Sequence, residues 1–498
     1  MSEEEERIIG SSVRQGKFEP AEEKHQLLNN RTYMNMLCRI PKRYVVGIMA
    51  FFGFCNIYAL RVNLSVAIVA MTTSKTTYLS ENKTLTILPD YTWDSHTKGI
   101  ILGSFFYGYI FTQLPGGYLA TKIGGKHLFG CGIFVTAVFT LLTPLCAHVS
   151  VYLLVAVRVL EGLFEGVTYP SIHAIWSKWA PPAEKTKLAT LAFSGSYVGT
   201  VISLPLSAAL AESSMGWPAI FYVFGAIGMV WFVFWCYLVS ESPSKHPTIS
   251  NQELEYIQGT IGYSDEQTQD LSPPWRQILT SLPVWAIVAA HFSENWGFYT
   301  WLTELPSFMS GVLHFNMYQA GFLAAVPYLV MAIVVQVSGH FADYLRGKVQ
   351  VSTEAVRKLF TCGAFFIQVV FMIGAGYTMT KTSCMICLTI AVGVGGFAWG
   401  GFSVNHLDIA PQYASILMGL SNTFATLPGI ISPALTGAIV TEKGNAGDWQ
   451  IVFYIASGVY VFGAIIYGIF ASGNRQKWAD VVTGYLPHNE ALETRHED

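Results

Sequence analysis

Long apolar runs alternate with short polar segments along almost the whole chain. At roughly 20 residues or more, each run is long enough to cross the hydrocarbon core of a bilayer as an α-helix. Six runs precede and six follow a polar stretch at residues 241–282, as in secondary transporters built from two repeats. The pattern therefore predicts an all-α polytopic membrane protein with two six-helix pseudo-repeats. The twelve predicted spans are residues 44–71, 99–121, 127–147, 151–176, 188–211, 217–239, 283–311, 319–342, 357–379, 383–404, 412–440 and 448–471.

The distribution of basic residues orients these spans. Of the 29 Lys and Arg residues, 22 lie in segments on one side of the predicted membrane, five on the other side and two inside spans. Because basic loops remain in the cytosol, both termini are predicted to be cytosolic. The chain then divides into an N-terminal tail (1–43), a first bundle (44–240), a central cytosolic loop (241–282), a second bundle (283–472) and a C-terminal tail (473–498). The first tail has no apolar run, so no cleavable signal peptide is expected.

Composition narrows the functional class. Charged residues make up 12% of the chain, about half the share found in soluble domains, and hydrophobic residues make up 52%. The formal net charge of −3 offers no basic surface for nucleic acid. The cysteines lie mostly in or beside apolar runs, and no His, Cys, Asp and Glu spacing predicts a metal site or a bound cofactor. No nucleophile is paired with a base, so an enzyme is the least favoured class.

Four charged residues inside predicted spans are the main candidates for function. A charge at bilayer depth costs at least about 2.5 kcal/mol, so such residues mark functional sites. Arg61 lies in the middle of the first span, where its permanent charge offers a forked donor to a carboxylate or phosphate. The fourth span carries Arg158, Glu161 and Glu165 at offsets of 3 and 7, which place them on one helix face. A fixed cation and titratable acids are the minimum set for moving an anion with a proton. The alternative interpretation is a structural ion pair between Arg158 and one glutamate.

Further titratable residues extend this set. His173 lies near the polar face of the fourth span and is a candidate for proton coupling. Glu294, at the start of the seventh span, is a candidate for substrate binding, and the alternative is that it caps the end of the helix.

Short motifs in the polar segments predict sorting and modification. Glu23 precedes Leu27 and Leu28 with the spacing of the acidic dileucine signals that clathrin adaptors bind for delivery to endosomes and lysosomes. Asn82 opens an N-x-T sequence in the longest non-cytosolic loop, which predicts a glycosylation site.

Longer motifs resemble a known superfamily. Residues 116–126, which include Gly117, Lys122 and Gly125, resemble the loop signature of the major facilitator superfamily, with Thr121 in place of its usual acid. A second copy after the eighth span keeps that acid as Asp343, followed by Arg346. The resemblance implies the major facilitator fold and assigns a conformational role to these motif residues.

Four further segments narrow the resemblance to one family. Residues 51–64, 103–117, 161–182 and 405–411 are similar to the anion-transporter family that contains sialin, the vesicular glutamate transporters and the type I phosphate transporters. The motifs look closest to the sialin branch, which implies a proton-coupled lysosomal exporter of sialic acid and acidic sugars.

The resemblance also implies roles for single residues. Arg61 matches the arginine that engages the substrate anion, and Arg158 with Glu165 matches a pair shared by sialin and the glutamate carriers. Glu161 matches an additional acid of sialin. The chain departs from the glutamate carriers at Leu102, in place of a histidine, and at Glu294, in place of an arginine. Glu294 is also not the sialin residue.

The sequence thus predicts a secondary active transporter that moves organic anions with protons by alternating access. Arg61, Arg158 and Glu294 are the substrate-binding candidates, and Glu161, Glu165 and His173 are the proton-coupling candidates. The predicted location is a lysosomal or endosomal membrane, with the plasma membrane as the alternative. A sodium-dependent phosphate cotransporter is the second hypothesis, and an anion channel or a non-transporting sensor represents a different class.

Overall fold

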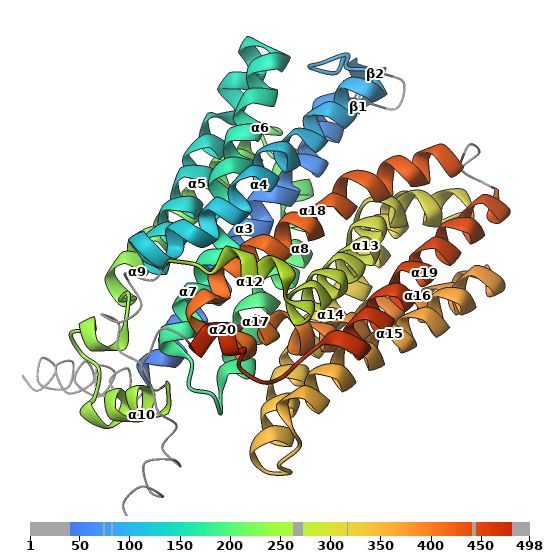
Figure 1. Cartoon of the computed structure of the whole chain (residues 1–498). Helices are drawn as coiled ribbons and strands as arrows, with labels where there is room; N and C mark the ends of the chain where they lie inside the picture. Colours follow the sequence, from blue (N-terminus) through green and yellow to red (C-terminus); the bar gives the residue numbers. More distant parts are fainter. Residues whose placement is uncertain are drawn as a thin grey trace, which may run out of the picture.

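The structure is a computed structural model that describes residues 40–72, 75–80, 83–261, 272–315, 317–440 and 445–480. Its first half contains seven long or medium helices and one hairpin, coloured blue to green in Figure 1. These elements are α3 (Lys42–Thr72), β1 (Lys75–Ser80), β2 (Lys83–Ile87), α4 (Ser95–Ile123), α5 (Gly125–Val149), α6 (Val151–Glu165), α7 (Thr168–Trp179), α8 (Lys185–Ala211) and α9 (Pro218–Leu238).

The second half follows after α10 (Asn251–Ile261) and α12 (Trp275–Thr280), and is coloured yellow to red. Its elements are α13 (Leu282–Gly311), α14 (Met317–Gly347), α15 (Thr353–Thr378), α16 (Lys381–Ala398), the π-helix η2 (Trp399–Ser403), α17 (Val404–Ile409), α18 (Ala414–Ile439), α19 (Ala446–Phe470) and the short α20 (Lys477–Asp480). Two single-turn 3₁₀ helices, η1 (Pro243–Lys245) and η3 (Pro411–Tyr413), complete the list.

The predicted fold class is confirmed. Nine helical segments of the described residues are long and apolar enough to cross a membrane. Three further spans, formed by α4, by α6 with α7 and by α13, fall outside that group and carry much of the polar site described below. Together they match the twelve predicted spans. The hairpin of β1 and β2 was not predicted from the sequence.

Side-chain caps define several of these helix starts. Asp94 accepts a hydrogen bond from the backbone N–H of Thr97 at 3.0 Å, and Ser150 and Ser352 cap α6 and α15 in the same way. Such caps satisfy backbone donors that the first helical turn leaves free.

The most extensive packing between helices of the two halves joins α8 with α14, and α18 with both α4 and α7. The described chain begins and ends at the same end of the molecule, where α10 and α20 lie, and we call this end the terminal face (Figure 1). The β1–β2 hairpin lies at the other end, which we call the hairpin face.

Candidate substrate and proton site

Arg61 lies in the middle of α3 and is 9% exposed. Its guanidinium carbon lies 4.7 Å from the ring centroids of Tyr58 and Tyr109 and 4.9 Å from that of Phe105. Aromatic faces attract a cation, and the attraction strengthens when water is excluded. The three rings therefore hold the charge in place without neutralising it.

Glu165, at the end of α6, neutralises Arg61. The Arg61 Nε donates to Glu165 Oε1 at 2.9 Å, and Nη2 forms an ion pair with the same oxygen. Arg61 Nη1 and Glu165 Oε2 are buried and have no hydrogen-bond partner in the part of the chain that the structure describes. Each member of the pair thus keeps one unused polar atom.

Arg158 and Glu161 form a second ion pair, one turn apart on α6. Glu161 Oε1 also accepts hydrogen bonds from Thr140 at 3.0 Å and Thr143 at 3.3 Å, both on α5. Both carboxylate oxygens of Glu161 are therefore occupied, in contrast to those of Glu165. The structure brings the four predicted charges together as two pairs, and Arg158 is paired with Glu161.

Close packing of α4 on α6 places the aromatic rings of the site. A Cβ atom on Gly108 or Gly162 would collide with the backbone of the facing helix, at Val159 and Phe105 respectively. Only glycine permits this approach, which brings Phe105 and Tyr109 against Arg61. The helix then breaks after Glu165, since residues 166–167 form a turn before α7.

Glu294 lies in the other half, on α13, and is 1% exposed. Its Oε1 atom and Gln368 Nε2 of α15 both lie beside Gly395, and its Oε2 atom has no hydrogen-bond partner among the described residues. Among the described residues, no Lys or Arg nitrogen lies within ion-pair distance of its carboxylate. The structure does not bring Glu294 into the Arg61 cluster.

His173 also lies outside that cluster. It is buried on α7, where Nδ1 lies 3.1 Å from the carbonyl oxygen of Tyr169 and Nε2 lies 3.0 Å from that of Ser403 in the second half. Its ring lies 5.2 Å from that of His406, which contacts Ser421 Oγ at 2.9 Å. In this structure His173 connects the two halves.

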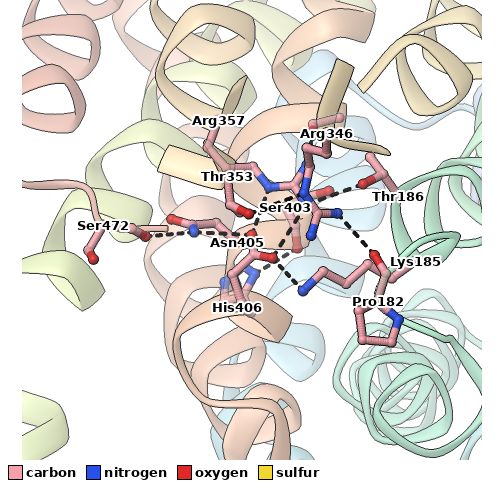
Figure 2. Close-up of polar contacts among 12 residues, drawn as sticks. Pro182, Lys185, Thr186, Arg346, Thr353, Arg357, Ser403, Asn405, His406 and Ser472 are labelled. Carbon is pink, nitrogen blue, oxygen red and sulfur yellow. Dashed lines mark hydrogen bonds and ion pairs between the residues drawn. The ribbon is translucent and has the colours of Figure 1, made fainter. Parts of the chain in front are cut away.

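A second charged cluster connects the halves at the terminal face (Figure 2). Asp408 Oδ1 pairs with Lys185 at 2.5 Å, and Oδ2 accepts from Arg357 Nε at 2.7 Å. Arg357 also donates to the carbonyl oxygen of Gly400 at 2.7 Å and to Thr186 Oγ1 at 3.2 Å. Lys185 and Thr186 begin α8 of the first half, so these bonds cross between the halves.

The motif residues of the second half contribute to the same contacts between the two halves at the terminal face. Asp343 Oδ2 accepts from the backbone N–H of Lys187 at 2.8 Å, and Arg346 donates to the carbonyl oxygen of Pro182 at 3.1 Å. The first-half copy differs, because Thr121 bonds within its own helix, to the carbonyl oxygen of Tyr118.

In the first-half motif, Gly117 lies against α18. Its carbonyl oxygen accepts from Ser415 Oγ at 3.0 Å, and a Cβ atom at this position would collide with the backbone of Ser415. Gly125 begins α5, where its N–H donates to Glu241 at 3.1 Å, and Lys122 lies exposed in the last turn of α4. Together with bonds from Asn422 of α18 to α4, these contacts close the molecule from its middle to the terminal face.

Several functional candidates were missed in the sequence. Asp408 is a charged residue within a span, and a charge within a span is the signal that identified Arg61. Asp408 was missed because the tenth span was predicted to end at residue 404. Arg357 was placed at the edge of a span and counted with the loops. Phe105 and Tyr109 gave no signal, because aromatic residues are common in apolar runs. The predicted sorting residues Glu23, Leu27 and Leu28 and the glycosylation site at Asn82 lie outside the described residues.

Comparison with known proteins agrees with this architecture. A family model described as Major Facilitator Superfamily matches residues 46–433. The chain belongs to the major facilitator superfamily. Among curated relatives, human sialin is 49% identical over 453 residues, which cover 88% of this chain and 90% of sialin. Human vesicular glutamate transporter 2 is 46% identical over 444 residues, which cover 89% of this chain and 76% of that protein.

These relatives place the chain in the superfamily group of sialin and the vesicular glutamate transporters, so it is a transporter and not an enzyme. Among solved structures, the proton:xylose symporter XylE bound to 6-bromo-6-deoxy-D-glucose matches with a TM-score of 0.66 at 13% identity. The match covers 88% of this chain and 98% of XylE, and it shows the shared fold.

Proposed function

We propose that this superfamily member is a proton-coupled symporter of organic anions that works by alternating access. The proposal rests on the ion pair between Glu165 and the guanidinium of Arg61. A substrate carboxylate and Glu165 compete for that cation, because two buried anions beside one cation repel each other. Protonation of Glu165 removes its charge, which releases Arg61 for the substrate. Substrate and proton therefore bind together.

We assign the two glutamates different roles, because their contacts differ. Glu161 is held by Arg158, Thr140 and Thr143, so it keeps Arg158 in place. Glu165 has one free carboxylate oxygen and a single cationic partner, so it is the acid that exchanges a proton. The other half then moves against this site when the terminal-face contacts open.

The similarity to sialin and to vesicular glutamate transporter 2 supports an organic acid as the substrate, such as sialic acid, an acidic sugar or an acidic amino acid. We propose that the terminal face, where the described chain begins and ends, faces the cytosol from a lysosomal or endosomal membrane. A clathrin adaptor that binds the dileucine segment would deliver the protein there.

The test compares Glu165→Gln with Glu161→Gln in proteoliposomes. Uptake of labelled sialic acid, glutamate and phosphate is measured with and without a proton gradient and with and without sodium. For Glu165→Gln we expect gradient-driven uptake to be lost while substrate exchange across the membrane continues, since glutamine mimics the protonated acid. Glu161→Gln is expected to lower the rate but to keep the response to the gradient.

Three outcomes would contradict the proposal. An unchanged proton response in Glu165→Gln would remove the coupling role of that residue. Sodium-dependent phosphate uptake at neutral pH would favour the cotransporter hypothesis. Flux with neither gradient coupling nor exchange would indicate a channel.

A further inference from the structure

The second half contains a polar site that the proposed mechanism does not use. Glu294 of α13 and Gln368 of α15 are each 1% exposed, and Glu294 Oε1 and Gln368 Nε2 both lie beside Gly395. Gln368 Nε2 also lies 3.1 Å from the hydroxyl of Tyr460 on α19, to which it donates. Both side chains lie against Gly395 of α16, where the missing side chain leaves room for them. We call Glu294, Gln368 and Tyr460 the acceptor site.

The unused atoms of this site are hydrogen-bond acceptors. Glu294 Oε2 and Gln368 Oε1 are buried and have no partner among the described residues. Buried polar atoms in proteins are nearly always hydrogen-bonded. Two neighbouring acceptors without donors therefore indicate a ligand that brings O–H or N–H groups.

The Arg61 cluster shows the opposite pattern. Its unpartnered atoms include two cationic donors, Arg61 Nη1 and Arg158 Nε. One half thus offers free donors from fixed cations, and the other half offers free acceptors around an acid with no cation beside it.

An aromatic layer lies between the two sites. Phe298 is one helical turn beyond Glu294, and its ring lies 6.5 Å from that of Tyr58, which covers Arg61. Phe298 also lies 5.9 Å from Tyr197 of the first half. A molecule that reaches both sites must pass this layer, and its two ends must differ in chemistry.

We propose that the acceptor site binds the donor-bearing end, with hydroxyl or ammonium groups, of the same anion whose carboxylate binds Arg61. The inference rests on the proposed function and specifies its substrate class. The substrate is an elongated acid with a carboxylate at one end and O–H or N–H donors at the other. An unsubstituted carboxylic acid gives the acceptors nothing to bind.

The test measures binding by thermal shift of the purified protein, without a proton gradient, so it is independent of transport. Two matched pairs of probes separate the donor groups. Glucuronate is compared with cyclohexanecarboxylate, which lacks its hydroxyl groups, and glutamate is compared with glutarate, which lacks its ammonium. In the wild type we expect at least one pair to show a preference of about ten-fold for the donor-bearing member.

Substitutions test which side chains cause the preference for the donor-bearing acid. Glu294→Met and Gln368→Met keep the size of the side chain but remove its acceptor, and each should bring the preference close to one. Gln450→Met, which makes the same change at the hairpin end of α19, should keep it, since Gln450 instead donates to the carbonyl oxygen of Gly376. The pair that responds identifies hydroxyl or ammonium as the group bound.

The proposal is overturned if the wild type does not prefer the donor-bearing member of either pair, including the case in which none of the four acids binds. It is also overturned if both methionine variants bind and keep the preference. Arg61→Ala should abolish binding of all four acids. If binding survives in Arg61→Ala, the anion site of the proposed function fails, whatever the acceptor site does.

Discussion

The mid-membrane cluster around Arg61 and the terminal-face cluster around Asp408 are both built from buried charges, but they differ in how fully those charges are satisfied. One carboxylate oxygen of Asp408 pairs with Lys185, and the other accepts a hydrogen bond from Arg357. The other two guanidinium nitrogens of Arg357 donate to Gly400 and Thr186. At Arg61, one guanidinium nitrogen and one oxygen of Glu165 remain without a partner.

This difference separates two uses of buried charge. A fully satisfied network stabilises one arrangement of the chain, because breaking it leaves an uncompensated ion. An ion pair with unused hydrogen-bonding atoms can be stable enough for the protein to fold. It is stabilised further when another polar group binds to those atoms. The terminal-face cluster therefore stabilises a closed conformation, and the Arg61 cluster is suited to binding. Three experiments test this distinction.

The largest effect is expected at Arg61. Arg61→Ala removes the one cation that is paired with Glu165 among the described residues, and loss of a buried charge partner costs about 3–5 kcal/mol. Uptake of the organic anion should fall by at least about 100-fold, because the anion loses its forked donor. The measurement is initial uptake in proteoliposomes together with the melting temperature.

The double variant Arg61→Ala with Glu165→Ala separates binding from stability. It removes both charges, so the melting temperature should recover relative to Arg61→Ala, whereas uptake should remain absent. Recovery of uptake in the double variant would show that Arg61 has only a structural role.

A smaller effect is expected when the terminal-face cluster is broken. Asp408→Asn leaves Lys185 and Arg357 buried without a carboxylate, which destabilises the closed arrangement by a few kcal/mol. The two halves should separate at this face more often. Spin labels at Ala183 and Lys348, both exposed there, should report a longer distance once the exposed cysteines Cys131 and Cys236 are replaced by serine.

Glu354→Gln is the matched control for this experiment. Glu354 pairs with Lys358 at 2.7 Å at the same face, but its side chain is 40% exposed, and exposed pairs contribute little. Its label distance should equal that of the wild type. An unchanged distance in Asp408→Asn would contradict the role of the cluster in closure.

The sequence predicted the members of the mid-membrane cluster better than their pairing. Apolar runs of helical length make a charge conspicuous, so Arg61, Arg158, Glu161 and Glu165 were all identified. The choice of partners depends on how α3 lies against α6, and offsets of 3 and 7 along one helix leave both glutamates available to Arg158. Pairing is therefore a property of tertiary packing.

The terminal-face cluster was missed for a different physical reason. The tenth span continues through the π-helix η2 into α17, beyond its predicted end at residue 404, so Asp408 was not recognised as an acid inside a span. Hydropathy locates the apolar centre of a span well, but the ends of a span contain both apolar and charged residues. There the sequence does not distinguish the residues of a buried ion pair from those of a polar loop.

The smallest effect is expected at the edge of the terminal face. Glu184, just before α8, pairs with Arg43 at 2.6 Å and with Lys187 at 3.1 Å. Partial burial raises the pKa of Glu184, but hydrogen bonds and charge from Arg43 and Lys187 outweigh it and lower the pKa below its ordinary value. An acid with a lowered pKa stabilises the fold above its unfolded pKa, and this contribution disappears as the pH falls through the folded pKa. Glu184→Gln should therefore lower the melting temperature by about 2 °C at pH 7 and by less at pH 3. The control Glu212→Gln changes an exposed acid at the other end of α8 and should show no difference at either pH. If the loss of stability in Glu184→Gln is as large at pH 3 as at pH 7, then Glu184 acts through packing, and charge satisfaction would matter only in the buried centre of the terminal face.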